Sequence, residues 1–168
     1  MVYTSTKNHD EMLFFTNLGR IYSKYVYQMP EGSRTSKGRA VVNLLNLSNG
    51  EHIVKLLCTR SLSDLCLALI TKKGTIKRVQ ASSFAKIRQT GIRAISLNDG
   101  DELAFCVLTS GSDSLIVATK KGMVIRFMEK EVRVMGRQAS GVRAIRLGSG
   151  DEVIGVQVVQ PDHDILFV

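Results

Sequence analysis

The chain repeats itself three times, with a period close to fifty residues. One motif is a leucine followed three residues later by glycine and then by an acid, and it occurs at 47–51, 97–101 and 147–151. A second has a threonine followed three residues later by glycine, at 16–19, 71–74 and 119–122. In a third, a glycine has an arginine close behind it, at 38–39, 91–93 and 141–143. Self-similarity at this period indicates a repeat architecture, in which each unit is one supersecondary module stacked on the next.

The positive charge follows the repeat. The windows 16–39, 71–93 and 119–146 hold 20 of the 23 Lys and Arg but only 3 of the 15 Asp and Glu. A surface shaped only by solubility would mix the two signs along the chain. We therefore expect stacked units to align their cations into one stripe, the electrostatic footprint of a binder of a long polyanion.

Each unit is predicted to contain four strands. Apolar runs at 13–15, 67–70 and 115–118 stop at the threonine–glycine motif, and second runs follow it at 20–22, 75–79 and 123–127. A glycine that closes a short loop between two such runs favours a hairpin with positive φ at its last turn residue. Third runs lie at 53–57, 103–108 and 153–159, each preceded by an arginine-bearing stretch that we expect to be a fourth strand. Four strands per fifty residues are typical of a propeller blade.

We expect an all-β chain with no sustained helical period. The units are predicted at 13–63, 64–112 and 113–160, with 1–12 closing a preceding blade and 161–168 opening a following one. Propellers usually need four to eight blades to close. The chain is therefore expected to be a partial ring, about three complete blades cut from a larger protein, with apolar blade faces free to self-associate.

Several functional classes find no support in the sequence. No run of eighteen apolar residues predicts a membrane span, and no leader of signal-peptide composition precedes the first unit, so we expect a cytoplasmic location. The three cysteines form no CxxC pair and are expected to be reduced core thiols. The three histidines lack ligand spacing, which argues against a metal site. No catalytic constellation or phosphate-binding glycine loop recurs, so we expect neither catalysis nor a cofactor in this chain.

The motifs resemble a known family. The segments 15–22, 30–38 and 43–47, followed by the later Thr-Lys-Lys-Gly turns and by 136–143, are similar to the C-terminal domain of DNA gyrase A subunits over essentially the whole chain. This resemblance implies a β-pinwheel, a propeller-like ring of four-stranded antiparallel blades that exchange a strand with their neighbours. It also implies wrapping of double-stranded DNA around a basic rim. The implied partners are the remainder of the gyrase A polypeptide and the gyrase B polypeptide, in an enzyme that uses ATP to introduce negative supercoils. Such an enzyme works in the bacterial cytoplasm, at the nucleoid.

One departure from the family concerns its signature heptapeptide, the gyrase box of type QRRGGKG. The chain lacks it, although 34–39, 88–93 and 137–143 resemble degenerate copies, and we expect the box to lie upstream of Met1. Its absence leaves open the A-type subunit of topoisomerase IV, whose C-terminal ring is similar. The longer first unit favours gyrase.

The candidate DNA-binding residues are the cations of these loops and turns. Arginine forks match phosphate oxygens, and glycine lets backbone N–H groups approach a phosphate. The set is Arg34, Lys37, Arg39, Arg88, Arg93, Arg137, Arg143, Lys72, Lys73, Lys77, Arg78, Lys120, Lys121 and Arg126. Two other classes of function remain open, a scaffold for an acidic protein partner and an enzyme with a site in the propeller channel. Repetition of the basic loops in every unit favours a ligand that itself repeats, as a phosphate backbone does.

Overall fold

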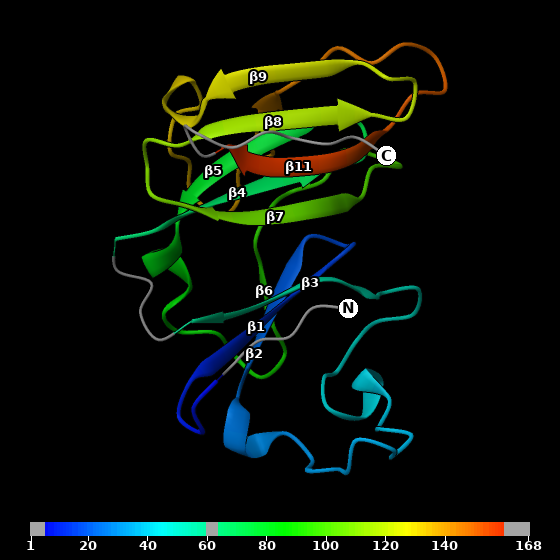
Figure 1. The fold of residues 1–168 in the computed structure, drawn as a ribbon, viewed down its shortest axis with the longest axis vertical. Coiled ribbons are helices and arrows are strands. Elements are labelled where there is room, and N and C mark those ends of the chain that lie inside the picture. Colours follow the sequence, from blue (N-terminus) through cyan, green and yellow to red (C-terminus); the bar gives the residue numbers. More distant parts are fainter. Residues whose placement is uncertain (1–5, 60–63, 160–168) are drawn as a thin grey trace.

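Three antiparallel sheets are stacked along the long axis of the molecule (Figure 1). The computed structural model describes residues 6–59 and 64–159. Each sheet is built around one unit of the repeat, which confirms the predicted all-β blade architecture. The helical elements in these two ranges are single turns of 3-10 helix, namely η1 (Val26–Gln28), η2 (Val41–Asn43), η3 (Ala81–Phe84) and η4 (Glu129–Glu131).

The three apolar runs of each unit form three neighbouring strands, with the first run in the middle. The strands of the first unit are β1 (Glu11–Thr16), β2 (Arg20–Tyr25) and β3 (Ile53–Thr59). Those of the second are β4 (Cys66–Thr71), β5 (Thr75–Gln80) and β7 (Leu103–Thr109). Those of the third are β8 (Ser114–Thr119), β9 (Val124–Met128) and β11 (Val153–Val159). The predicted runs and the observed strands therefore coincide apart from their ends.

The turn between the first two strands is the one that the sequence predicts. Its glycine has a positive φ in all three units, 70° at Gly19 and 81° at Gly74 and Gly122. A residue with a Cβ is strained in that region of backbone conformation. The threonine–glycine motif thus reports a hairpin in every unit.

The arginine-bearing stretches of the second and third units form fourth strands, but these do not join the sheet of their own unit. The stretch of the first unit, which contains Arg39, forms no strand, so the expected fourth strand is wrong there. Strand β6 (Ile92–Arg93) pairs with β2 of the first unit, and β10 (Val142–Arg143) pairs with β5 of the second. The expectation of four strands from one unit is wrong in this respect, and the strand exchange that the resemblance implies is confirmed. The third sheet has three strands within the described ranges. The chain ends, expected to belong to a fourth blade, lie largely outside those ranges.

Two apolar cores lie between the sheets. The first joins the sheets of units one and two through residues such as Phe15, Leu69 and Phe84, and the second joins units two and three through residues such as Ile70 and Leu115. Strand β4 is buried along its whole length because its sheet is the middle one of the three. This explains why its sequence is continuously apolar rather than alternating.

Candidate nucleic-acid interface

The exchanged strands of the second and third units are each fastened to the hairpin turn of the preceding unit. The Gly19 carbonyl oxygen accepts hydrogen bonds from the amides of Ala94 and Ile95, and the Gly74 carbonyl accepts the equivalent bond from Ala144. A Cβ on Gly19 would lie 2.8 Å from the Ile95 carbonyl oxygen. The turn glycine therefore permits the close approach of the exchanged segment as well as positive φ. Its hydrogen bonds to Ala94 and Ala144 hold in place the arginines that precede these alanines, Arg93 and Arg143.

An open cavity of about 610 Å³ lies where the basic loops of units two and three meet. Its lining includes Lys86, Arg88 and Arg93 from the second unit and Arg137 from the third, with no carboxylate among the lining residues. All four of these side chains are exposed. We call this set of four cations the basic cavity; three of its members, all but Lys86, are in the predicted set.

A neighbouring open cavity of about 600 Å³ extends this surface toward the first unit. Arg93 lines it together with Arg20, whose guanidinium stacks over the Tyr22 ring at 5.6 Å from the ring centroid. The same guanidinium donates a hydrogen bond to the Thr90 carbonyl oxygen. Sequence reasoning missed Arg20 and Lys86 as candidate site residues, although both lie inside the basic windows.

Other predicted arginines and one lysine are placed elsewhere on the surface. Arg34, Lys37 and Arg39 are exposed in the long loop of the first unit, where the last two line a separate cavity of about 240 Å³. Arg143 is exposed on β10. Arg126 is exposed on β9, and its Nε donates to the Ser114 hydroxyl at 2.9 Å. The structure thus divides the predicted arginines between the basic cavity and other sites.

The lysine pairs of the hairpin turns are matched with acids of the leucine–glycine–acid motif. In the second unit, the Lys73 amide donates to the Asp101 carboxylate at 3.0 Å, and the Lys72 ammonium pairs with Glu102 at 2.8 Å. The hydrogen bond from Lys72 lowers the pKa of Glu102 and in turn raises the pKa of Lys72.

The third unit repeats this arrangement. The Lys121 amide donates to Asp151 at 3.0 Å, and Lys120 pairs with Glu152 at 3.3 Å. The two repeated motifs therefore fasten each other within a blade. Ion pairs partly neutralise the charges of Lys72 and Lys120, whereas the ammonium groups of Lys73 and Lys121 donate to backbone carbonyl oxygens.

Lys77 is not a surface residue, and its prediction as a DNA contact is wrong. Its side chain is completely buried, with 0% exposure. Strand β5 lies in the middle sheet, so the side chains on both of its faces meet neighbouring elements. A buried ammonium cannot reach a phosphate, and this one donates to carbonyl oxygens of the protein instead.

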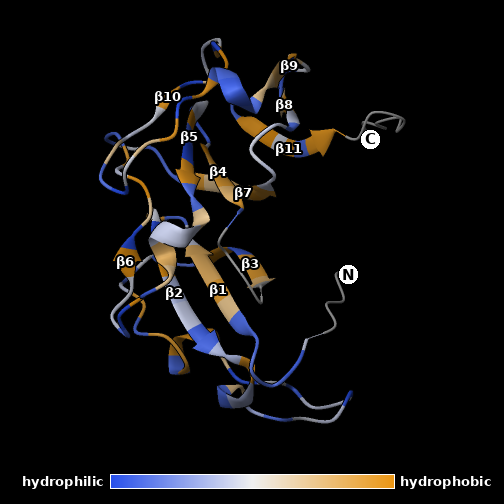
Figure 2. Ribbon diagram, turned by 90° about the vertical axis from the view of Figure 1, so that its left-hand side faces the viewer, coloured by the Kyte–Doolittle hydropathy of each residue, from blue (hydrophilic) through white to orange (hydrophobic). Residues whose placement is uncertain are grey.

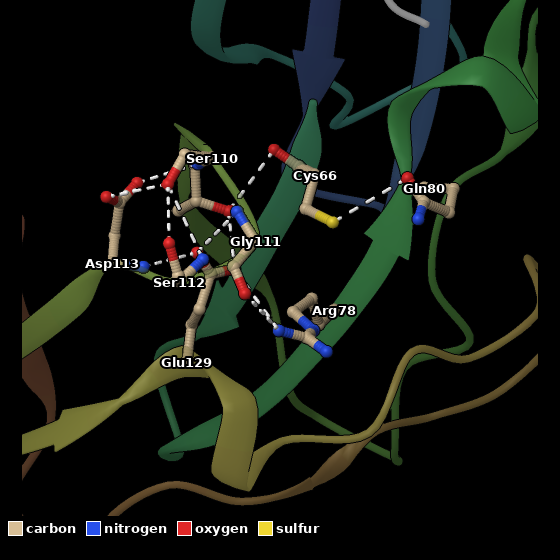
Figure 3. Close-up of polar contacts among 9 residues, drawn as sticks. Cys66, Arg78, Gln80, Ser110, Gly111, Ser112, Asp113 and Glu129 are labelled. Atoms are coloured by element: carbon tan, nitrogen blue, oxygen red, sulfur yellow. Dashed lines mark hydrogen bonds and ion pairs between the residues drawn. The ribbon is translucent and has the colours of Figure 1, made fainter. Parts of the chain in front are cut away.

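Arg78 is committed to an internal ion pair between units two and three (Figure 3). Its side chain is 12% exposed and lies 3.5 Å from the carboxylate of Glu129, which is fully buried. The same carboxylate accepts hydrogen bonds from the Thr109 hydroxyl and the amides of Gly111 and Asp113. Arg78 therefore stabilises the packing of two blades and does not face a ligand.

The described part of the chain gives no sign of a metal centre or a membrane span. Residues 6–59 and 64–159 contain no cluster of three or more potential metal ligands and no helix long and apolar enough to cross a bilayer. The three cysteines form no disulfide with one another. Cys66 and Cys106 are buried, and burial raises the pKa of the Cys66 thiol. The expected core position is therefore confirmed for Cys66 and Cys106, whereas Cys58 is only partly buried.

The repeat matches a known family model over all three units. The model of the DNA gyrase C-terminal domain, a β-propeller, matches residues 10–60, 67–110 and 113–160. The gyrase A protein of Salmonella typhimurium is 42% identical over 161 residues, which is 95% of this chain and 18% of the relative. The equivalent protein of Staphylococcus aureus is 43% identical over 152 residues, which is 89% of this chain and 17% of the relative. The chain thus spans under a fifth of these curated relatives.

Solved structures agree on the fold. A structure of the DNA gyrase A C-terminal domain aligns with a TM-score of 0.75 at 27% identity, over 92% of this chain and 50% of the other. The C-terminal domain of a DNA topoisomerase IV aligns with a TM-score of 0.84 at 24% identity, over 91% and 48%. The second likeness shows the fold alone because its identity is low, whereas the family model and the gyrase A relatives match the sequence itself. With its three hairpin blades joined by exchanged arginine-bearing strands, the chain belongs to the DNA gyrase C-terminal domain family.

Proposed function

We propose that this chain binds double-stranded DNA through its phosphates, without regard to base sequence. The observation that carries the proposal is the basic cavity, in which Arg88, Arg93 and Arg137 from two consecutive units meet with no acid in the lining. Guanidinium groups bind phosphate oxygens in a bidentate manner, and such contacts position a protein on DNA without reading its sequence.

The arrangement of the exchanged strands supports a ligand that runs along the stack. Strands β6 and β10 lie along the same side of the molecule (Figure 2). Each brings an exposed arginine, Arg93 or Arg143, to that side. A DNA duplex presents regularly spaced phosphates to such a row of arginines. The carboxylates on the surface of an acidic protein need not be regularly spaced.

The biological role that we propose follows from the family. Within a gyrase A polypeptide that works with gyrase B in the cytoplasm, the domain would hold a wrapped DNA segment and so support ATP-dependent negative supercoiling. The chain itself would contribute binding and no catalysis. A role in topoisomerase IV is the second candidate, because the chain itself carries no intact gyrase box.

The test is duplex affinity as a function of salt concentration. Each neutralised phosphate releases counterions, so about six contacts would reduce affinity roughly a thousandfold between about 50 and 200 mM salt. Replacing Arg88, Arg93 and Arg137 together with alanine should reduce the slope of log affinity against log salt by about 0.9 for each lost contact.

The matched control replaces three cations that do not line the basic cavity, namely Lys7, Lys24 and Lys55, with alanine. It removes the same charge from the chain. Equal slopes in the two triple variants would contradict the proposal and favour a scaffold that binds an acidic protein.

A further inference from the structure

Lys77 is buried and has no anionic partner among residues 6–59 and 64–159. Its side chain is 0% exposed, and its ammonium makes hydrogen bonds of 2.7 Å to the Ala94 carbonyl oxygen and 2.6 Å to the Arg137 carbonyl oxygen. Burying a charge is costly unless it is paired and well hydrogen-bonded. Neutral residues such as methionine would fill the same space at lower cost, so the two hydrogen bonds indicate a specific role.

The two acceptors belong to the two chain segments that form the basic cavity. Ala94 directly follows Arg93, and the other acceptor is the carbonyl of Arg137 itself. The same segments are also joined by Ser96, whose hydroxyl donates to the Gln138 carbonyl at 2.7 Å and whose amide donates to the Ala139 carbonyl at 3.2 Å. Lys77 thus holds, from the protein interior, the backbones that carry two cavity arginines from different units.

The equivalent position in the first unit shows how specific this contact is. Tyr22 takes the place of Lys77 there, and its hydroxyl donates to the Asn46 carbonyl at 3.3 Å and to the Glu51 carboxylate at 3.1 Å. Both acceptors lie within the first unit. Lys77 differs because it reaches the following unit as well as its own, across the junction where the basic cavity lies.

We propose that Lys77 is a positioning residue that fixes the separation of the Arg93 and Arg137 segments, and thereby the spacing of the phosphates that the cavity can hold. This role rests on the proposed function. An ammonium group suits it because it offers three donors at the end of a long stem, enough to satisfy carbonyls from two directions.

The test compares Lys77→Met with Val79→Ala in the 168-residue chain. Methionine keeps most of the stem and the apolar packing but donates no hydrogen bond. Val79 is fully buried on the same strand, in the core between units one and two, so its truncation destabilises the fold without removing either tether. Circular dichroism melting establishes that both variants are folded. Duplex affinity is then measured against salt, and amide hydrogen exchange is measured over 88–95 and 136–141.

We expect Lys77→Met to reduce the salt slope by about 0.9, the equivalent of one phosphate contact, and to speed exchange in both segments. Val79→Ala should keep the slope of the unmodified chain at a comparable loss of melting temperature. An unchanged slope in folded Lys77→Met, or unchanged exchange in both segments, would overturn the positioning role. If the unmodified chain binds no duplex, the proposed function fails and the positioning role with it, whereas the exchange data still decide whether the tether exists.

Discussion

The ring of Tyr22 lies directly against Gly91, so closely that a Cβ on the glycine would stand 2.7 Å from a ring carbon. Gly91 also has a φ of 72°. We expect Gly91→Ala to lower the free energy of unfolding on two grounds, because positive φ costs about 1–2 kcal/mol and overpacking about 1–3 kcal/mol.

The matched control for that substitution is Gly38→Ala. Gly38 occupies the same place in the first unit and has a φ of 75°, but a Cβ there would meet nothing within 4 Å. Urea denaturation should therefore show a larger loss for Gly91→Ala than for Gly38→Ala. Equal losses would mean that the contact with Tyr22 contributes nothing.

The pairing of Arg78 with Glu129 predicts a second stability effect. Glu129→Gln removes the buried carboxylate and leaves the Arg78 charge without its partner, which costs about 3–5 kcal/mol for a buried pair. Glu152→Gln breaks the exposed pair with Lys120 and should cost at most about 1 kcal/mol. Thermal melting of the two variants decides the prediction, and similar losses in both would contradict it.

Lys77 predicts a stability that rises with pH in the alkaline range. Burial lowers the pKa of Lys77 from 10.5 to about 8, so the folded state releases this proton more readily than the unfolded state does. The cost of burying the charge is fully present below pH 8 and is relieved between pH 8 and about 10.5. Urea denaturation between about pH 7 and 10 should show the unmodified chain gaining stability relative to Lys77→Met. A difference independent of pH would refute this assignment.

Strand β9 predicts self-association of the chain. Val124, Ile125 and Met128 are exposed on this strand, and Met123 is exposed just before it. The strand has no further neighbour among the described residues, whereas β2 and β5 each pair with an exchanged strand. An exposed apolar edge strand is a template for pairing with another chain. Sedimentation velocity at rising concentration should reveal oligomers, and Val124→Lys should suppress them. Val42→Lys, at a similarly exposed apolar residue outside any strand, should not. A chain that stays monomeric at high concentration would exclude this edge as an interface.

Most of the fold could be predicted because local signals repeat three times. An apolar run, a threonine–glycine turn and a second apolar run define each hairpin, and Gly19, Gly74 and Gly122 have the expected positive φ. The pairing of β6 with β2 could not be derived from these residues alone. Its two residues carry little hydrophobic pattern, and the choice of sheet depends on contacts between units, such as those of Ala94 with Gly19.

The candidate site could be predicted less completely. Arg88, Arg93 and Arg137 lie together as a basic stripe requires, but charge alone did not distinguish them from Lys77, which looks equally exposed in a strand of mixed composition. Alternation of apolar and polar residues along a strand indicates which side chains share a face of the sheet. It does not reveal whether other elements of the protein pack against both faces. The acids that pair with the turn lysines were likewise visible in the sequence, but their partners became clear only in the hydrogen bonds of each blade.

The exchanged strands give the stack of blades a direction, because each blade accepts a strand from the unit that follows it. Both observed junctions consist of the same two parts, a hairpin edge that accepts a strand and a glycine–arginine segment of the next unit that supplies it. Such a head-to-tail contact does not limit the number of units that can be joined in a row. A contact between two identical surfaces differs, because it joins two units and leaves no equivalent surface for a third. Removing or adding a whole unit between equivalent positions would leave each remaining edge with a segment of the same kind to accept. The length of the basic surface can therefore change in steps of one blade without the invention of a new interface.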